Sequence, residues 1–305
     1  MVNKLKEHIG EYFVGQEDII ENVLICLLAG GHILLEGVPG VGKTTLAETL
    51  ARSVDCDFAR IQFTPDTLPT DVMGTEIFNM KTGEFEYREG AIMHQIVLAD
   101  EINRTSPKTQ SSLLESMAEG QTTVSGVKYE LPKPFMVIAT QNPSDFLGTY
   151  PLPEAQMDRF MMKLTISYPD EEEELRMAQN MLQNKIVKKA ESVVTSQEVL
   201  EMQQKVSEIS IKENVILYAR GIVNQTREEA SFVHGASPRA LLAMIKAAQA
   251  KAYLEGRDYV KPDDIKAVVR NVLGHRLVLS AEAKNAREDK FKILDSLIVQ
   301  VKVPF

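Results

Sequence analysis

A glycine-rich loop between an apolar run and a helix constrains the fold of this chain more than any other feature of its sequence. The apolar run His32–Glu36 leads into residues 37–44, which read GVPGVGKT, and the helical stretch Thr44–Val54 follows. The spacing G-x-x-x-x-G-K-[ST], with a strand before it and a helix after it, is typical of a phosphate-binding loop. We therefore expect an α/β fold that binds a polyphosphate.

The loop supplies most of the expected nucleotide-binding residues. These are Gly37, Val38, Pro39, Gly40, Val41, Gly42, Lys43, Thr44 and Thr45. The glycines let backbone N–H groups close around phosphate oxygens, and the helix N-terminus adds the positive end of its dipole. Lys43 is expected to reach the β- and γ-phosphates and the Thr44 hydroxyl to ligate magnesium. The pattern indicates a nucleoside triphosphate and Mg²⁺ as ligands.

Four further apolar runs predict the other strands of a doubly wound sheet. They cover Phe58–Phe63, Ile96–Ala99, Phe135–Ala139 and Phe160–Ile166. Of these, Ile96–Ala99 and Phe135–Ala139 are continuously apolar, and such runs, buried on both faces, are typical of a parallel sheet between helices. Two segments, at about residues 77–87 and 121–131, have the turn signals of hairpins and are expected to be insertions.

After Tyr168 helical signals replace strand signals. Helices are expected at Ser196–Ile209, Glu213–Arg227, Pro238–Glu255 and Pro262–Leu273, and Gly256 and Gly274 stand where helix-ending glycines belong. The chain is therefore expected to divide into a nucleotide-binding αβα domain, residues 1–169, and an all-helical domain, residues 170–305.

Acidic and polar side chains follow two of the predicted strands. Asp100 and Glu101 come directly after the run Ile96–Ala99. Asp100 is expected to hold Mg²⁺ and Glu101 to polarise the attacking water, although two solvated acids at a strand end are the alternative. Asn142 follows the strand Phe135–Ala139 and could orient water or touch the γ-phosphate, but Asn-Pro is also an ordinary turn signal.

Two arginines are candidates for phosphate contacts. Arg159 comes just before the last predicted strand. Arg239 lies in the first turn of a helix that Ser237 caps and Pro238 begins. A cation there opposes the helix dipole, so a phosphate ligand accounts for it better than local helix stability does. A surface ion pair is the alternative for either arginine.

The charge balance argues against nucleic-acid and membrane-surface partners. The chain has 34 Lys and Arg against 43 Asp and Glu, a net charge of -9, whereas proteins that bind nucleic acids or anionic lipids are usually basic. Its longest apolar stretch, Val23–Gly31, is too short to span a bilayer. Cys26 and Cys56 suit reduced thiols, so we expect a cytoplasmic protein without membrane insertion.

The chain resembles the MoxR family of AAA+ ATPases from Phe13 to about Leu279. The segments that carry the resemblance are VGQ at 14–16, the phosphate loop, QFTPD at 62–66, LADEINR at 98–104, ATQNP at 139–143, PEAQMDRF at 153–160 and GASPRA at 235–240. Many families share the phosphate loop alone, whereas its combination with DEINR, ATQNP and GASPRA is specific.

The resemblance implies a sheet of five parallel strands with a helical lid, and assembly as a ring, commonly a hexamer, with ATP at the subunit interfaces. It implies that Val14, Gly15 and Gln16 lie near the adenine. The two hairpins then correspond to the helix-2 insert and the sensor-1 insert of this clade.

The resemblance also gives roles to the isolated polar residues. Asn142 is similar to sensor 1, and Arg239 to sensor 2 on the lid. Arg159 is similar to the arginine finger that reaches the neighbouring subunit's site, and Arg104 is a second candidate for that finger.

The function that the resemblance implies is chaperone-like, ATP-driven remodelling in the maturation or assembly of a partner protein or complex. Family members commonly work with partners that carry a von Willebrand factor A domain, and we expect that partner to be a separate protein. A metal-chelatase-like motor subunit is one alternative. A nucleic-acid motor or loader is disfavoured by the acidic balance, and a scaffold without turnover by Glu101, Asn142 and the two arginines.

Overall fold

The computed structural model describes residues 2–142, 148–182 and 190–303, and their contacts divide the chain into two compact units. The first comprises Met1–Glu21, His32–Arg159 and Leu164–Leu200, and the second Asn22–Gly31, Phe160–Lys163 and Glu201–Phe305. The units interleave along the sequence, and the division near residue 170 stays a prediction. Pro143, the last residue of the ATQNP segment, lies outside the described residues.

A five-stranded sheet forms the core of the fold, with the strand order β2-β5-β8-β1-β9. The strands are β1 (Ile33–Gly37), β2 (Phe58–Gln62), β5 (Ile96–Asp100), β8 (Met136–Gln141) and β9 (Met162–Ile166). Pairs β1–β8, β2–β5 and β5–β8 are parallel. All of β5 is buried, as are the apolar residues of β1 and β8, because helices cover both faces. The predicted α/β class with its five strands is confirmed.

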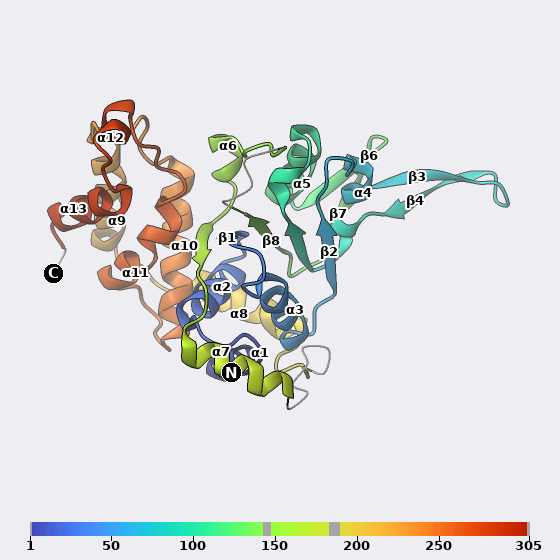
Figure 1. Cartoon of the computed structure of the whole chain (residues 1–305), viewed down its shortest axis with the longest axis horizontal. Coiled ribbons are helices and arrows are strands. Elements are labelled where there is room, and N and C mark those ends of the chain that lie inside the picture. Colours follow the sequence, from blue (N-terminus) through green and yellow to red (C-terminus); the bar gives the residue numbers. More distant parts are fainter. Residues whose placement is uncertain (1, 143–147, 183–189, 304–305) are drawn as a thin grey trace. The chain divides into compact units, whose positions relative to one another are not determined.

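The helices of the first unit precede, connect or follow these strands (Figure 1). They are α1 (Val2–Tyr12), α3 (Lys43–Ser53), α4 (Pro69–Met73), α5 (Pro107–Glu119), α6 (Glu154–Met157) and α7 (Glu171–Leu182), with the 3-10 turns η1 (Ala91–Met93) and η2 (Ile102–Arg104). The Ser106 hydroxyl accepts from Thr109 N and caps α5 at its start. Gly120, in the left-handed conformation, ends that helix.

Two antiparallel hairpins accompany the sheet. One is formed by β3 (Gly74–Asn79) and β4 (Glu84–Glu89), and the other by β6 (Gln121–Val124) and β7 (Val127–Glu130). In Figure 1 the β3–β4 hairpin projects away from the body of the first unit. It is longer at both ends than the turn signals predict. Tyr87 fixes its base: its ring stacks on Tyr129 of β7, and its hydroxyl donates to Met73 O.

The second unit is mainly helical. Its helices are α9 (Glu213–Glu228), α10 (Pro238–Leu254), α11 (Pro262–Leu273), α12 (Ala281–Asn285) and α13 (Lys290–Gln300), while α2 (Glu17–Leu28) and α8 (Ser196–Glu208) have residues in both units. Small buried residues such as Ala240, Ala247 and Ala248 let α10 pack closely on α11. None of the helices in the described ranges is long and apolar enough to cross a membrane.

The two glycines expected to end helices do so for different reasons. Gly256, after α10, has φ 71°, the left-handed conformation that glycine adopts without a steric penalty. Gly274, after α11, has φ -56° and is right-handed. A Cβ at Gly274 would lie 2.7 Å from Arg270 O and 2.8 Å from the Phe291 ring. Close packing, and not backbone handedness, therefore requires glycine at position 274.

Candidate functional site

A cavity of about 370 Å³ lies in the first unit, where β1, β5 and β8 end. The strand register brings these ends together, because Glu36 of β1 pairs with Gln141 of β8, Ala99 of β5 with Ala139 of β8, and Gln62 of β2 with Asp100 of β5. Residues of the glycine-rich loop and of the strand ends line the cavity: Pro39, Gly40, Gly42, Lys43, Thr44, Thr45, Arg60, Gln62, Asp100, Glu101 and Asn142. Ligands bind at such strand ends in open α/β sheets.

The loop has the backbone of an anion cradle. Gly40 and Gly42 have φ 87° and 88°, and a Cβ at Gly37 would lie 2.7 Å from Ile166 O. Gly42 is the N-cap of α3 and offers no side-chain cap, so the first N–H groups of that helix suit a bound anion. Lys43 Nζ donates to Gly37 O at 2.6 Å, inside the loop. These features fit the triphosphate of a nucleotide.

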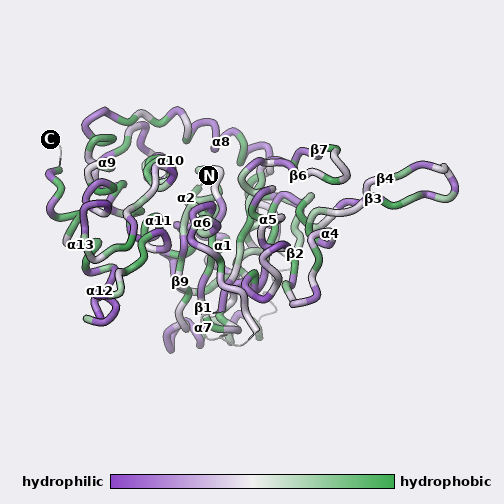
Figure 2. Tube along the Cα trace, turned by 90° about the horizontal axis from the view of Figure 1, so that it is seen from above, coloured by the Kyte–Doolittle hydropathy of each residue, from purple (hydrophilic) through white to green (hydrophobic). Residues whose placement is uncertain are grey.

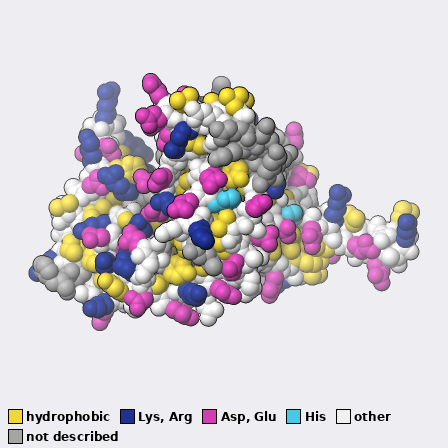
Figure 3. All heavy atoms as spheres, turned by 90° about the horizontal axis from the view of Figure 1, so that it is seen from below, with side chains coloured by type: hydrophobic (Ala, Val, Ile, Leu, Met, Phe, Trp, Pro, Cys, Tyr) yellow, Lys and Arg dark blue, Asp and Glu magenta, His cyan; other side chains and the backbone are white. Residues whose placement is uncertain are grey.

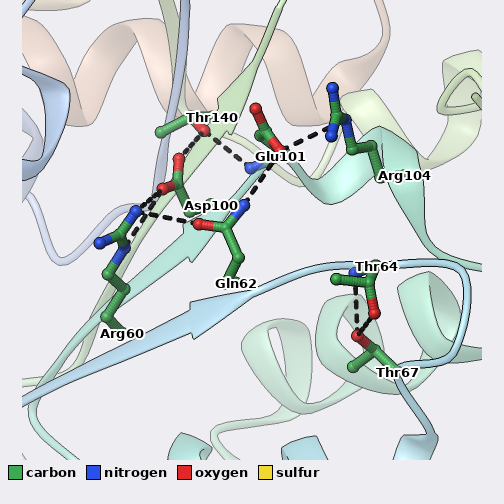
Figure 4. Close-up of polar contacts among 8 residues, drawn as sticks. All are labelled: Arg60, Gln62, Thr64, Thr67, Asp100, Glu101, Arg104 and Thr140. Atoms are coloured by element: carbon green, nitrogen blue, oxygen red, sulfur yellow. Dashed lines mark hydrogen bonds and ion pairs between the residues drawn. The ribbon is translucent and has the colours of Figure 1, made fainter. Parts of the chain in front are cut away.

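Asp100 receives hydrogen bonds from both neighbouring strands (Figure 4). Thr140, on β8, donates from Oγ1 to Asp100 Oδ1 at 2.7 Å. Arg60, on β2, donates to Asp100 Oδ2 from Nη2 at 2.6 Å and from Nε at 3.2 Å. Asp100 is 8% exposed, and these donors compensate the cost of burying its carboxylate. Thr44 and Asp100 together offer a hydroxyl and a carboxylate oxygen to a cation, the ligand types that Mg²⁺ prefers.

Glu101 is held by the same network. Its N–H donates to Thr140 Oγ1 at 2.9 Å. Its Oε2 accepts from Gln62 Nε2 at 2.9 Å and pairs with Arg104 Nε at 3.3 Å. Glu101 also has φ 58°, and a non-glycine residue in this region is typically strained by about 1–3 kcal/mol. Such strain is common where a side chain must be aimed at a ligand.

Three polar residues of this site were missed by sequence reasoning: Arg60, Gln62 and Thr140. Arg60 and Gln62 are two residues apart on β2, so their side chains lie on the same face of the strand. Gln62 Oε1 also accepts a hydrogen bond from Arg60 Nη2 at 2.9 Å. A signal was present, because two long polar side chains two residues apart are unusual in an otherwise apolar run. Their partners, however, depend on β2 lying beside β5.

The sequence predicts that the glycine-rich loop and the pair Asp100 and Glu101 form one nucleotide site, and most of these residues line the same cavity. Asn142, buried at 6% exposure, joins them there from the end of β8. Gly37, Val38 and Val41 do not line it. The roles of all these residues stay predictions.

The other predicted site residues lie elsewhere. Arg159 Nη1 donates to Leu114 O of α5 at 2.6 Å and does not line the cavity. Arg239 is exposed in the first turn of α10, in the second unit. The Ser237 hydroxyl accepts from Ala240 N and caps that helix, as its sequence predicts.

The residues predicted near the adenine form a turn between α1 and α2. Gly15 and Gln16 have φ 79° and 51°. Gln16 N donates to Glu173 Oε1 at 3.3 Å, and Gln16 Nε2 to Ser167 O at 3.0 Å. A Cβ at Gly15 would lie 2.2 Å from the Glu173 carboxyl. Val14 lines a second cavity, of about 710 Å³, with residues of α1 and α7. Adenine contact by these three residues stays a prediction.

Comparison with protein families finds a match to an ATPase domain followed by a match to a lid domain. Residues 32–162 match the ATPase family associated with various cellular activities (AAA), and residues 224–297 match the AAA lid domain. The first match contains the whole cavity lining, and the second contains Arg239.

Individual relatives match over most of the chain. It is 49% identical to the uncharacterized protein YeaC of Bacillus subtilis, over 100% of this chain and 95% of YeaC. It is 42% identical to Chaperone MoxR1 of Mycobacterium tuberculosis, over 88% of this chain and 74% of MoxR1. A crystal structure of a proposed ATPase from Cytophaga hutchinsonii superposes with a TM-score of 0.93 at 41% identity, covering 100% of this chain and 95% of the other.

Proposed function

Because the chain belongs to the MoxR family of AAA+ ATPases, we propose that it hydrolyses ATP in the cavity at the carboxyl edge of its sheet. One observation carries the proposal: the loop donors, the acidic pair and Asn142 line the same cavity. Phosphoryl transfer to water depends almost entirely on positioning and on charge stabilisation, and these residue types supply both.

In the proposed site, backbone N–H groups of the loop and Lys43 hold the phosphates. Thr44 and Asp100 hold Mg²⁺, which would neutralise charge on the phosphate oxygens. Mg²⁺ takes few protein ligands and keeps several waters, so one hydroxyl and one carboxylate are sufficient. Arg60 donates to Asp100 in the described structure, and in the proposed complex it shares that carboxylate with the cation.

Glu101 is the general base of the proposed reaction. Thr140 anchors its backbone, while Gln62 and Arg104 fix the direction of its carboxylate. A base positioned beside the attacking water contributes roughly 10²–10⁴-fold to the rate. Asn142, in the role of sensor 1, orients that water from the end of β8.

We further propose that the active form is a ring, in its simplest form a hexamer, with ATP at the subunit interfaces. Arg159 is then the finger that enters the neighbouring subunit's site, a contribution of about 10³–10⁵-fold in enzymes that use such a residue. Arg104, which pairs with Glu101 of its own subunit, is the second candidate for the finger. Arg239 acts as sensor 2 from the lid.

The output we propose is remodelling of a partner protein in its maturation or assembly, in the cytoplasm. The likeness to Chaperone MoxR1 supports it. The β3–β4 hairpin is the proposed contact site for the client protein. A separate protein with a von Willebrand factor A domain is the proposed partner of the ATPase. A metal-chelatase-like motor subunit is the second candidate. The net charge of -9 disfavours a nucleic-acid motor.

The hydrolysis proposal is tested by Glu101→Gln, which keeps the size and the hydrogen bonds of the side chain but removes the base. We expect nucleotide binding to persist and turnover with Mg²⁺ to fall roughly 10²–10⁴-fold. Glu115→Gln, at an exposed position of α5, is the matched control. Equal turnover by Glu101→Gln and the control would refute the assignment of the base.

A further inference from the structure

The chain segment that follows Arg159 belongs, by its contacts, to the second unit. Arg159 is the last residue of a long first-unit stretch, and Phe160–Lys163 is a short piece of the second unit before the chain returns to the first at Leu164. The Arg159 guanidinium itself donates to Leu114 O in the first unit. The peptide bond between Arg159 and Phe160 is therefore a junction between the units.

Two neighbouring side chains of the second unit hold this short segment by its backbone. His275 Nε2 donates to Phe160 O at 3.1 Å, and Arg276 Nη2 donates to the same oxygen at 2.8 Å. Arg276 Nη1 donates to Met161 O at 3.1 Å and also to Val272 O. We call these two residues, with their bonds to Phe160 and Met161, the carbonyl clamp.

The carbonyl clamp lies largely in the protein interior, and its histidine is a hydrogen-bond donor. Phe160 is 0% and His275 4% exposed, and Arg276 is half-buried. Phe160 O accepts from both residues, so only the loss of both donors would leave this carbonyl unsatisfied in the interior, at about 1–3 kcal/mol. Burial keeps the pKa of His275 well below its ordinary value, which leaves a neutral ring with one N–H, and that N–H is given to Phe160 O. Val272 O is at the end of α11, where a cation such as Arg276 is favoured by the helix dipole.

We infer that Arg276 is a positioning residue for Arg159, so that the lid of one subunit sets hydrolysis in the neighbouring subunit's site. The inference rests on the proposed function, in which Arg159 is a finger that acts in trans. The clamped carbonyls belong to the two peptides that follow Phe160, and together they fix the position of the Phe160 α-carbon. Because consecutive α-carbons are held about 3.8 Å apart by a planar peptide, a displacement of the Phe160 α-carbon also displaces the backbone of Arg159. A misplacement of about 1 Å of a positioning group can cost roughly 10²-fold in rate.

Arg276→Ala removes three of the hydrogen bonds, and we expect turnover to fall roughly 10–100-fold with little change in the KM for ATP. Arg276→Lys keeps the charge and can restore part of the turnover, because a point charge satisfies fewer of the fixed carbonyls than the guanidinium fork. Arg220→Ala, at an exposed position of α9, controls for loss of an arginine in the same unit. Unchanged turnover in Arg276→Ala would overturn the inference.

Mixed rings separate an effect on the neighbour's site from an effect on the subunit's own site. Glu101→Gln subunits lack a base but have an intact finger, so mixing them with Arg276→Ala subunits should restore turnover at the interfaces that combine both intact halves. Arg159→Ala and Arg276→Ala subunits share the same defect, so mixing these two should restore nothing. The reverse pattern, rescue by Arg159→Ala and none by Glu101→Gln, would show that Arg276 serves its own subunit's site and would overturn the inference.

The mixture of Arg159→Ala with Glu101→Gln tests the underlying proposal separately. If that mixture shows no rescue although each variant forms rings, Arg159 is not a trans-acting finger, and the inference fails with it. If Arg276→Ala does not fold, as judged by circular dichroism, Arg276→Lys takes its place in the same mixtures, with the same expected pattern at smaller amplitude.

Discussion

Thr140 links the two acids of the candidate site through one hydroxyl. It donates to Asp100 and accepts from the backbone of Glu101. Thr140 is fully buried, so no water can replace the hydroxyl without rearrangement. A single oxygen thus orients both the expected metal ligand and the expected base.

Thr140→Val removes that oxygen and keeps the shape of the side chain. We expect turnover to fall by about 10–100-fold, because both acids lose an anchor, and stability to fall by about 1–3 kcal/mol, because a buried carboxylate oxygen and an N–H lose a partner. Steady-state kinetics and thermal melting measure the two effects. Thr140→Ser, which keeps the hydroxyl, should stay close to wild type, and a Ser variant as impaired as Val would contradict this role.

We expect the free energy of unfolding to depend on pH through His32, which stands directly before β1. Its Nε2 bonds Met117 O at 3.2 Å, and its Nδ1 accepts from Val137 N at 3.0 Å. Burial lowers the pKa of His32 from 6.5 to about 4. The folded chain therefore holds a neutral ring, and the unfolded chain takes up the proton first as pH falls.

The contribution of His32 to stability is complete above about pH 6.5 and is lost as pH falls toward 4, by about 2–4 kcal/mol in all. His32→Gln keeps one donor and one acceptor but does not titrate. The difference in unfolding free energy between wild type and His32→Gln should shrink, or reverse, between pH 7.5 and 4.5. His234→Gln, at an exposed position, is the control. A difference that stays constant with pH would contradict a neutral His32 ring in the folded chain.

How far the site could be predicted depends on whether its residues share one motif or come together only in the sheet. The glycine-rich loop, Asp100 and Glu101 stand in continuous motifs that can be found in the sequence. The contact of Arg60 with Asp100 follows instead from the strand order β2-β5-β8, in which β5 lies between the strands of Arg60 and Thr140. That order is set by tertiary packing of the helices between the strands, which no local pattern contains.

The same distinction holds for whole elements. The buried strands β1, β5 and β8 are continuous apolar runs, and each was predicted within one or two residues. Helix α2 was missed because its continuous apolar run Val23–Leu28 is buried, and a short apolar run of this kind cannot be assigned to a helix or a strand by periodicity alone. Helices α12 and α13 were missed as well; α12 spans only Ala281–Asn285 and is too short to show a helical period.

The β3–β4 hairpin exposes apolar side chains on one of its faces. Phe78 and Phe85 are paired in register with ring centroids 5.3 Å apart, yet they are 55% and 69% exposed. Met80, in the turn, is 91% exposed. Figure 2 shows hydrophobic stretches toward the end of the hairpin, and Figure 3 shows hydrophobic side chains there beside charged ones. Exposed aromatic pairs of this kind are typical of contact sites for other proteins.

We expect the double variant Phe78→Ser, Phe85→Ser to keep basal ATP turnover, because the hairpin lies outside the sheet, and to lose most stimulation by an unfolded, reduced and alkylated probe protein. Glu84→Ser, whose side chain alternates with Phe85 to the other face of the hairpin, is the matched control. Loss of ring assembly in the double variant, seen by sedimentation, would show instead that the hairpin packs on an adjacent subunit, and would contradict the client contact.

The proposed function assigns nucleotide-binding residues to both units of the chain. Lys43, Asp100 and Asn142 belong to the first unit, and Arg239 to the second. A ligand touched by residues of both units ties their relative arrangement to its own presence, because it binds one arrangement better than the other. Loss of the γ-phosphate removes that difference. The proposed role of Arg239 as sensor 2 therefore predicts that Arg239 couples the lid to the nucleotide state.

Arg239→Ala separates this coupling from folding and from hydrolysis itself. Arg239 is exposed and stands in the first turn of α10, where its charge opposes the helix dipole. We therefore expect the variant to melt at the wild-type temperature or slightly above it. ATP binding should persist, since the loop and Lys43 are intact, while stimulation of turnover by the unfolded probe protein should be lost.

Calorimetry, nucleotide-binding titration and turnover with and without the probe measure these three outcomes, with Arg220→Ala as the control for removing an exposed arginine of the same unit. A variant that keeps its stimulation would show that Arg239 does not couple the lid to the nucleotide, and a lowered melting temperature would show that the arginine has a structural role.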